Sequence, residues 1–388
     1  MSQPGTISQS QDQASGADLR PKGGSKGPAW RRIASFVGIS ILVLALAVFG
    51  IARFLSIRAG QSSTPPNGNI PVEATKSVGL LRFQDGTAPA DAVTISTSTM
   101  PLPPTGSQYE AWLIQDDGEQ RISIGKISFG QNKKGSLKFV DPAGRNLIAT
   151  YSAMEITIEP EPDPNPNSSN NVAFAVTLPK DGLVHVRHLL YSFGATPNKI
   201  GLIDGLDTDT NLLTESAQQM LSALESGDQA GVLLQAESML NLIVGSKSAD
   251  HKDWNGNGTI DDPGDGYGLL TNGENLGYIQ GSFTHANLAI TSPNATQNML
   301  THGDHVKICA KNISDWTAQL HDQLVKIIET PSDAALIRQA VATANQIRVG
   351  FDVNGDEKIE PIPGEGGAET AYEHAYYMAD MLILPAGK

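Results

Sequence analysis

The longest apolar stretch of the chain is a run of twenty uncharged residues, 33–52, with the sequence IASFVGISILVLALAVFGIA. At a helical rise of about 1.5 Å per residue, such a run spans roughly 30 Å, which is the thickness of a hydrocarbon core. Five Lys and Arg residues precede it closely, whereas Arg53 and Arg58 follow it. Because cytoplasmic flanks carry the excess of positive charge, we predict a transmembrane helix over 33–57 with a cytoplasmic amino terminus. A cleaved secretory signal is the alternative, but the run is longer than the apolar region of a signal peptide.

The segments on either side of this run show no apolar period. Residues 1–32 are rich in Ser, Gln, Gly and Pro, and we expect a disordered cytoplasmic tail. Residues 58–75 contain the Ser, Pro and Gly of a stalk or linker. The pattern therefore predicts a protein of the cell membrane with a single span, whose large body is extracytoplasmic.

From about residue 76 to 180 the pattern changes to short alternating runs rich in β-branched residues. Turn signals such as Asp-Gly, Pro-Pro and Asp-Pro separate these runs. Eight short strands in about 100 residues favour a small antiparallel sandwich or barrel, and we predict a β-sandwich domain over 76–180. The expected strands are 78–83, 92–98, 109–114, 121–127, 136–140, 147–152, 154–160 and 172–178.

After residue 180 apolar residues recur at spacings of three and four, which is typical of helices. The fold class predicted for the whole chain is therefore multidomain α and β. It combines an N-terminal transmembrane helix, an antiparallel β-sandwich domain, and an all-α helical bundle over 181–388 with two calcium-type loops. The expected helices of the bundle are 211–226, 228–244, 295–328, 332–348 and 368–384.

Charge and cysteine content narrow the range of functions. The formal net charge is −14 although residues 1–32 are net positive, so the body is more acidic than the total indicates. An acidic body argues against nucleic acid as a partner, because nucleic-acid binding requires a basic face. The single cysteine, Cys309, excludes an intramolecular disulfide and a cysteine zinc cluster, and its apolar helical setting predicts a buried thiol.

Two acidic loops in the helical region carry the candidate chemistry. Both place oxygen side chains at positions 1, 3 and 5, a residue that can offer its backbone carbonyl at 7, and a carboxylate at 9, as calcium loops do. Position 8 is apolar in both loops, and we expect Ile260 and Ile359 to anchor the loops to the bundle. The predicted cofactor is Ca²⁺. The ligands are predicted to be Asp253, Asn255, Asn257, Thr259, Asp261 and Asp265 in the first loop, and Asp352, Asn354, Asp356, Lys358, Glu360 and Glu365 in the second.

The two loops depart from an ideal calcium loop at position 12, where a bidentate Glu is usual. Gly264 and Pro363 occupy that position, so the missing carboxylate is expected from Asp265 and Glu365, or alternatively from Asp262. Similar sequences surround both loops, and FTHA (283–286) after the first is similar to YEHA (372–375) after the second. A helix, a loop and a returning helix therefore occur twice. The loops resemble those of EF-hand and dockerin units.

Histidines offer a second candidate chemistry. His185 and His188, like His302 and His305, have the i, i+3 spacing that presents two imidazoles on one face of a helix. His285 and His374 hold matching positions in the repeat. A helical bundle that binds a metal or acts as an enzyme through His188, His285, His302, His305 or His374 is therefore an alternative function.

Three motifs of the β region carry a family resemblance. Tyr109-Glu-Ala-Trp112-Leu, then Ser123-Ile-Gly125, then Ile156-Thr-Ile-Glu-Pro160 follow the order of motifs in the extracytoplasmic C-terminal domain of anti-sigma-K factors. The resemblance implies a packing role for these residues, with Tyr109 and Trp112 filling the space between sheets. The zinc-binding helical domain that often holds sigma factors has no counterpart in residues 1–32, which contain no His and no Cys.

These observations favour a membrane-anchored, extracytoplasmic, calcium-binding sensory or interaction protein that is not an enzyme. Its expected partners are the membrane and a protein of a sigma-factor system or of the cell envelope. A regulator of the anti-sigma type that acts through a separate cytoplasmic partner is the other alternative.

Overall fold

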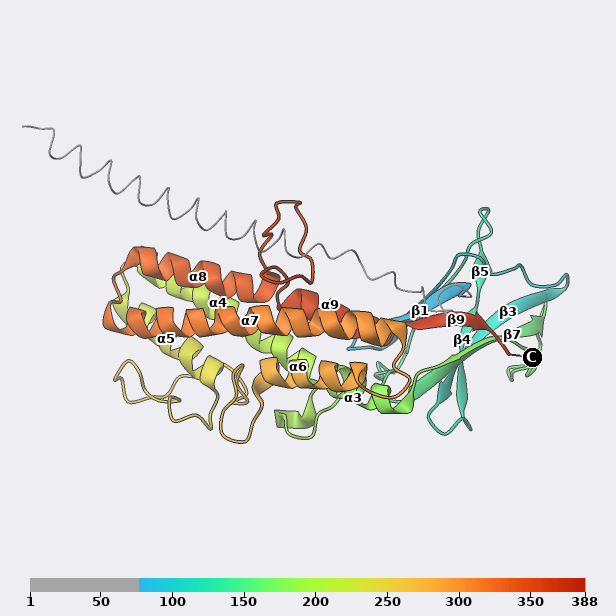
Figure 1. Cartoon of the computed structure of the whole chain (residues 1–388), viewed down its shortest axis with the longest axis horizontal. Helices are drawn as coiled ribbons and strands as arrows, with labels where there is room; N and C mark the ends of the chain where they lie inside the picture. The colour runs from blue at the N-terminus through green and yellow to red at the C-terminus, as the bar shows by residue number, and fades with distance from the viewer. Residues whose placement is uncertain (1–76, 388) are drawn as a thin grey trace, which may run out of the picture. The chain divides into compact units, whose positions relative to one another are not determined.

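The computed structural model describes residues 77–387 (Figure 1). These residues belong to one compact unit, which spans 69–388. The predicted tail, transmembrane helix (33–57) and stalk lie outside the described residues. Within 77–387, no helix is both long enough and apolar enough to cross a membrane.

Nine described strands form one antiparallel sheet in the order β4-β3-β7-β8-β9-β1-β2-β6-β5. The sheet curls so far that β4, at one end, contacts β6, near the other end. The strands are β1 (Gly79–Gln84), β2 (Ala92–Thr97), β3 (Ser107–Gln115), β4 (Arg121–Lys126), β5 (Ser128–Phe129), β6 (Gly135–Val140), β7 (Tyr151–Pro160), β8 (Val172–Thr177) and β9 (Met381–Pro385).

The sheet is a nearly closed barrel rather than the predicted sandwich of two separate sheets. The reason is β9, which comes from the carboxyl end of the chain and lies between β8 and β1. It pairs with β1 from Gly79↔Ile383 to Leu81↔Met381, and with β8 at Phe174↔Pro385 and Ala175↔Leu384. Because β9 pairs with β8 and with β1, it joins the group β4-β3-β7-β8 to the group β1-β2-β6-β5 in one sheet.

The aromatic motif of β3 contributes to the core as expected only in part. Tyr109 is buried in the main core and packs edge-on against Phe174, with ring centroids 5.7 Å apart. Trp112, three positions later, is buried outside that core cluster and donates from Nε1 to Thr157 Oγ1 at 2.8 Å. Side chains three positions apart in a strand point to opposite faces, so the two aromatics cannot fill the same space.

One expected strand, 147–152, is not a separate strand. Leu147 and Ile148 lie in a turn before β7, and both side chains are fully buried in the core. Their apolar character therefore reflects burial rather than strand pairing. β7 ends at Pro160, as the resemblance implied.

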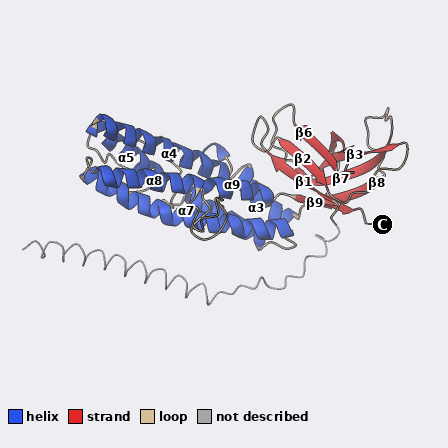
Figure 2. Ribbon diagram, turned by 90° about the horizontal axis from the view of Figure 1, so that it is seen from above, coloured by secondary structure: helices blue, strands red, loops and turns tan. Residues whose placement is uncertain are grey.

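The helices gather on one side of the unit and the strands on the other (Figure 2). The helices that the sequence predicted over 211–244 and 295–348 are present with shifted ends. For example, the last helix of that range begins after Asp333, whose side chain accepts from the backbone N–H groups of Ala335 and Leu336 at 3.1 Å. The described helices are α3 (Lys180–Leu190), α4 (Leu202–Ser226), α5 (Gln229–Val244), α6 (Gly277–Ile290), α7 (Gln297–Glu329), α8 (Ala334–Val349) and α9 (Ala368–Tyr377), with a short 3₁₀ turn at Pro197–Lys199.

The helix expected over 368–384 ends at Tyr377, and its last part is strand β9. Residues 181–388 are thus not purely helical, because they return a strand to the sheet. Cys309 is fully buried in α7, as predicted, and burial raises the pKa of its thiol to about 12.

Candidate metal centres

The first histidine cluster joins α3 to α6. His185 and His188 lie one turn apart on α3, and His285 lies on α6. The Nδ1 atom of His285 is 3.2 Å from Nδ1 of His185 and 3.1 Å from Nδ1 of His188. Three ring nitrogens therefore face one another, and we call this group the first triad.

The second triad repeats the arrangement between α7 and α9. His302 and His305 lie one turn apart on α7, and His374 lies on α9. The Nδ1 atom of His374 is 2.8 Å from Nδ1 of His302 and 3.2 Å from Nδ1 of His305. In each triad, ligand atoms of all three histidines lie within 4.8 Å of one another.

These distances suit a metal ion better than a set of hydrogen bonds. A ring nitrogen carries either one proton or one lone pair, so His285 or His374 can form only one well-directed hydrogen bond through Nδ1. Three nitrogens bound to one tetrahedral ion at 2.0–2.1 Å lie about 3.3 Å apart, and the ion uses all three lone pairs. The paired histidines of α3 and α7 are half-buried, and His285 is buried, with 7% exposed.

The protonation states also favour metal binding. Burial, with a smaller contribution from the neighbouring histidines and, for His302, from Arg82, lowers the pKa of His285 and of His302 to about 4. Burial lowers the pKa of His374 to about 3, to which His305, His302 and Arg82 contribute. Neutral imidazoles are the form that binds a metal, so both triads are ready to bind near neutral pH.

The two triads have different surroundings. The ring of Phe193 covers the first, with its centroid 4.8 Å from that of His285. Tyr377 packs against the second, 5.1 Å from His302, and the guanidinium of Arg82 lies 3.8 Å from the centroid of the Tyr377 ring. Arg82 also forms an ion pair with Asp380 at 2.6 Å, and its charge contributes to the lowered pKa of His302 and of His374.

The predicted acidic loops share one local structure. Asp253 accepts from the backbone N–H groups of Gly256, Asn257 and Gly258, and Asp352 accepts from those of Gly355, Asp356 and Glu357. The side chains at positions 3 and 5 of both loops accept from the N–H group two residues later. The side-chain oxygens at positions 1, 3 and 5 thus bind backbone, and among residues 77–387 the clusters of three or more His, Cys, Asp or Glu ligand atoms are the two triads.

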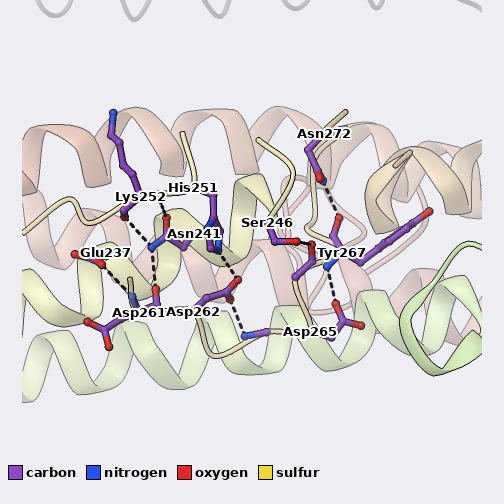
Figure 3. A network of polar contacts seen from close by, with 12 residues as sticks. Glu237, Asn241, Ser246, His251, Lys252, Asp261, Asp262, Asp265, Tyr267 and Asn272 are labelled. Carbon is purple, nitrogen blue, oxygen red and sulfur yellow. Dashed lines mark hydrogen bonds and ion pairs between the residues drawn. The ribbon is translucent and has the colours of Figure 1, made fainter. Parts of the chain in front are cut away.

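A buried glutamate supports each loop; Glu365 was among the predicted ligands, whereas Glu237 was not. Glu237 of α5 is fully buried and accepts from the N–H groups of Trp254, Asn255 and Asp261 at 2.9–3.0 Å. Figure 3 shows the bond from Asp261. Glu365 is also fully buried and accepts from Glu360 N at 2.6 Å, while its Oε2 has no hydrogen-bond partner. The signal for Glu237 was present, because it is a charged residue in the apolar run of α5.

Asparagines on the helices repeat the same support. Asn241 of α5 donates to the carbonyls of Lys252 and Asp261, and Asn312 of α7 donates to those of Ile362 and Gly366. Asn241 also accepts from Lys252 N, as Figure 3 shows. The side-chain amides of these two asparagines thus hold the backbone of both loops against the helices.

Other predicted loop residues lie differently from expectation. Ile260 was expected to anchor the first loop, but it is 51% exposed, and Trp254 packs against the core instead. Asp265, the expected late ligand, accepts from Tyr278 Oη at 2.5 Å and from Tyr267 N at 2.9 Å (Figure 3 shows the latter bond). Its carboxylate is therefore directed to the start of α6. In the second loop Glu360 lies 3.4 Å from Asn354 Nδ2, which keeps positions 3 and 9 together.

A family comparison concerns the part of the chain that forms strands β1 to β7. Residues 41–171 match the family described as anti-sigma-K factor rskA, C-terminal. This confirms the resemblance.

The anti-sigma-K C-terminal match covers about a third of the chain. It begins within the apolar run at 33–52 and includes β1 to β7, but it ends before β8. Both triads, both acidic loops and strand β9 lie outside it. No curated protein and no solved structure matches the chain.

Proposed function

We propose that the protein is a membrane-anchored, non-catalytic regulator of the anti-sigma type, whose helical region binds divalent transition-metal ions at the two histidine triads. The observation that carries this proposal is the convergence of three Nδ1 atoms at each of two repeated positions. Imidazole ligands suit zinc, copper, nickel and iron, and three of them leave a fourth position for water or another ligand.

The regulatory part of the proposal rests on the anti-sigma-K C-terminal match of residues 41–171. That family implies a sigma-factor system as partner. We propose that residues 1–32, which contain no His and no Cys, recruit a separate cytoplasmic protein. The uncharged run 33–52 supports the membrane anchor, and the excess of positive charge before it supports an extracytoplasmic body.

Metal analysis of the full chain tests the proposal. The purified wild-type protein, equilibrated with zinc and freed of excess metal, should retain two zinc ions per chain. His285→Ala and His374→Ala should each retain one, and the double variant none. His321→Ala is the matched control, because His321 lies on α7 outside both triads and should leave two ions bound. Retention of two ions by the double variant would refute the assignment.

Calcium binding by the two acidic loops is a second proposal. It is supported by the common structure of the loops and by the buried Glu365 Oε2, which has no partner. The same protein, titrated with calcium after the triads are filled with zinc, should show a higher melting temperature. The double variant Asp253→Asn, Asp352→Asn should lose that increase, and an equal increase in this variant would count against calcium at the loops.

A further inference from the structure

Two chain connections join the described strands to the helices. Strand β8 ends at Thr177 and is followed by α3 from Lys180, whereas α9 ends at Tyr377 and is followed by β9 from Met381. The helices α3 and α9 are thus the two helices that continue directly into strands of the sheet. Each of them carries part of one triad, namely His185 and His188 on α3 and His374 on α9.

The remaining ligands lie on helices that continue into other helices or loops. His285 is on α6, and His302 and His305 are on α7. Each triad therefore links a helix that is directly connected to a strand, α3 or α9, with a helix that is not, α6 or α7. Any ion bound by three imidazoles would fix the distance between those two helices, because the bonds to all three nitrogens must be kept near 2.0–2.1 Å.

The two connected strands, β8 and β9, are neighbours in the sheet, and their pairing is short. They pair at Phe174↔Pro385 and Ala175↔Leu384, and Ala386 N donates to Ala173 O at 2.9 Å, but the register does not continue past Ala175 toward α3. A cavity of about 750 Å³ lies beside the unpaired part, lined by Val176 and Leu382 from the strands, Leu183 from α3 and Asn298 from α7. The pairing of β8 with β9 is therefore short next to the two connections, which lead to the helices that carry the triads.

Further contacts attach the second connection to α7 and to β1. Asn298, one turn before His302 on α7, donates from Nδ2 to the carbonyl of Asp380 at 3.0 Å. The carboxylate of Asp380 accepts from Arg82 of β1 at 2.6 Å. A change in the position of α9 relative to α7 would thus reach β1 and β9 through partly buried polar contacts.

We propose that metal ions in the two triads lock α3 onto α6 and α9 onto α7, and that this lock stabilises the pairing of β8 with β9. Binding of metal in the helical region thereby changes the stability of strand pairing in the sheet that contains the anti-sigma-K-type strands. The inference rests on the proposed metal binding. An ion that binds the locked arrangement more tightly than the open one shifts the population toward the locked one.

Hydrogen exchange of the full chain, with zinc or with a chelator, tests this inference. Amides of 174–177 and 382–384 should exchange about tenfold more slowly with zinc, whereas amides of β4 and β6, which lie three places from β8 and β9 in the sheet, should change little. His374→Ala should abolish the protection of 382–384, and His285→Ala should reduce that of 174–177. His321→Ala should behave as wild type.

The outcomes separate this inference from the proposed function. If two zinc ions bind and the exchange of β8 and β9 is the same with and without zinc, the transmission is refuted while the metal sites stand. If no zinc binds to the triads, both proposals are refuted. If a histidine variant loses its helical circular dichroism, the comparison of wild type with and without zinc still decides between these results.

Discussion

At the scale of single residues, the sequence indicated two of the three histidines of each triad as a pair, and it indicated His285 and His374 through their matching positions in the repeat. The i, i+3 spacing of His185 and His188 was visible as a candidate pair, but nothing near them in sequence indicated His285, about 100 residues later. Only the packing of α3 on α6 brings them together. The matching positions of His285 and His374 in the repeat were the signal that could have linked both pairs to a third ligand.

The buried carboxylate of Asp209 gives a prediction of pH dependence. Asp209 is 2% exposed, and burial, with help from Asp265 and Asp262, raises its pKa from 3.8 to about 8. Between these values the folded state holds a proton that the unfolded state has lost, so the free energy of unfolding should fall as pH rises from about 4 to about 8. Asp209→Asn should remove this part of the decrease, measured by urea unfolding at pH 5 and pH 8.

The control for this measurement is Asp322→Asn, because Asp322 has a side chain that is 79% exposed. It should show the same decrease between pH 5 and pH 8 as the wild type. An Asp209→Asn variant with an undiminished decrease would show that Asp209 is not the buried acid that the geometry indicates.

At the scale of elements, periodicity predicted most strands and helices, because each buries one face over several turns or residues. It failed where the apolar run was short. Residues 381–385 fit a helix end or a strand equally well, and their pairing with β1, about 300 residues earlier, is a long-range contact that no local pattern encodes. The same limit applies to 147–152, whose apolar residues are buried in a turn.

The first acidic loop gives a prediction at this scale. Glu237 of α5 accepts from three backbone N–H groups of the loop, so Glu237→Gln should leave at least one of them without an acceptor. An unpaired buried group costs roughly 1–3 kcal/mol of stability. Urea unfolding should show a loss of that size, together with faster hydrogen exchange over 253–261.

Glu329→Gln is the control for the loop, because Glu329 is an exposed glutamate at the end of α7. It should change the free energy of unfolding little. Equal stability of Glu237→Gln and wild type would mean that the loop does not depend on the buried carboxylate.

At the scale of the whole described unit, the chain order explains the architecture. Each repeat places a pair of histidines, two antiparallel helices, an acidic loop and a helix with one histidine in the same order, α3 to α6 and then α7 to α9. In the second repeat the single 33-residue helix α7 takes the place of both α3 and α4 of the first repeat. The sequence predicted the repeat around the loops, including His285 and His374, and the structure extends it to the paired histidines of α3 and α7.

The most direct test of the account is the position of bound zinc in crystals of the protein grown with zinc. Anomalous difference maps collected at the zinc absorption edge should show two strong peaks, each about 2.0–2.1 Å from the Nδ1 atoms of three histidines, His185, His188 and His285 or His302, His305 and His374. Maps in which both triads hold no peak, in crystals that contain zinc elsewhere on the chain, would contradict the account.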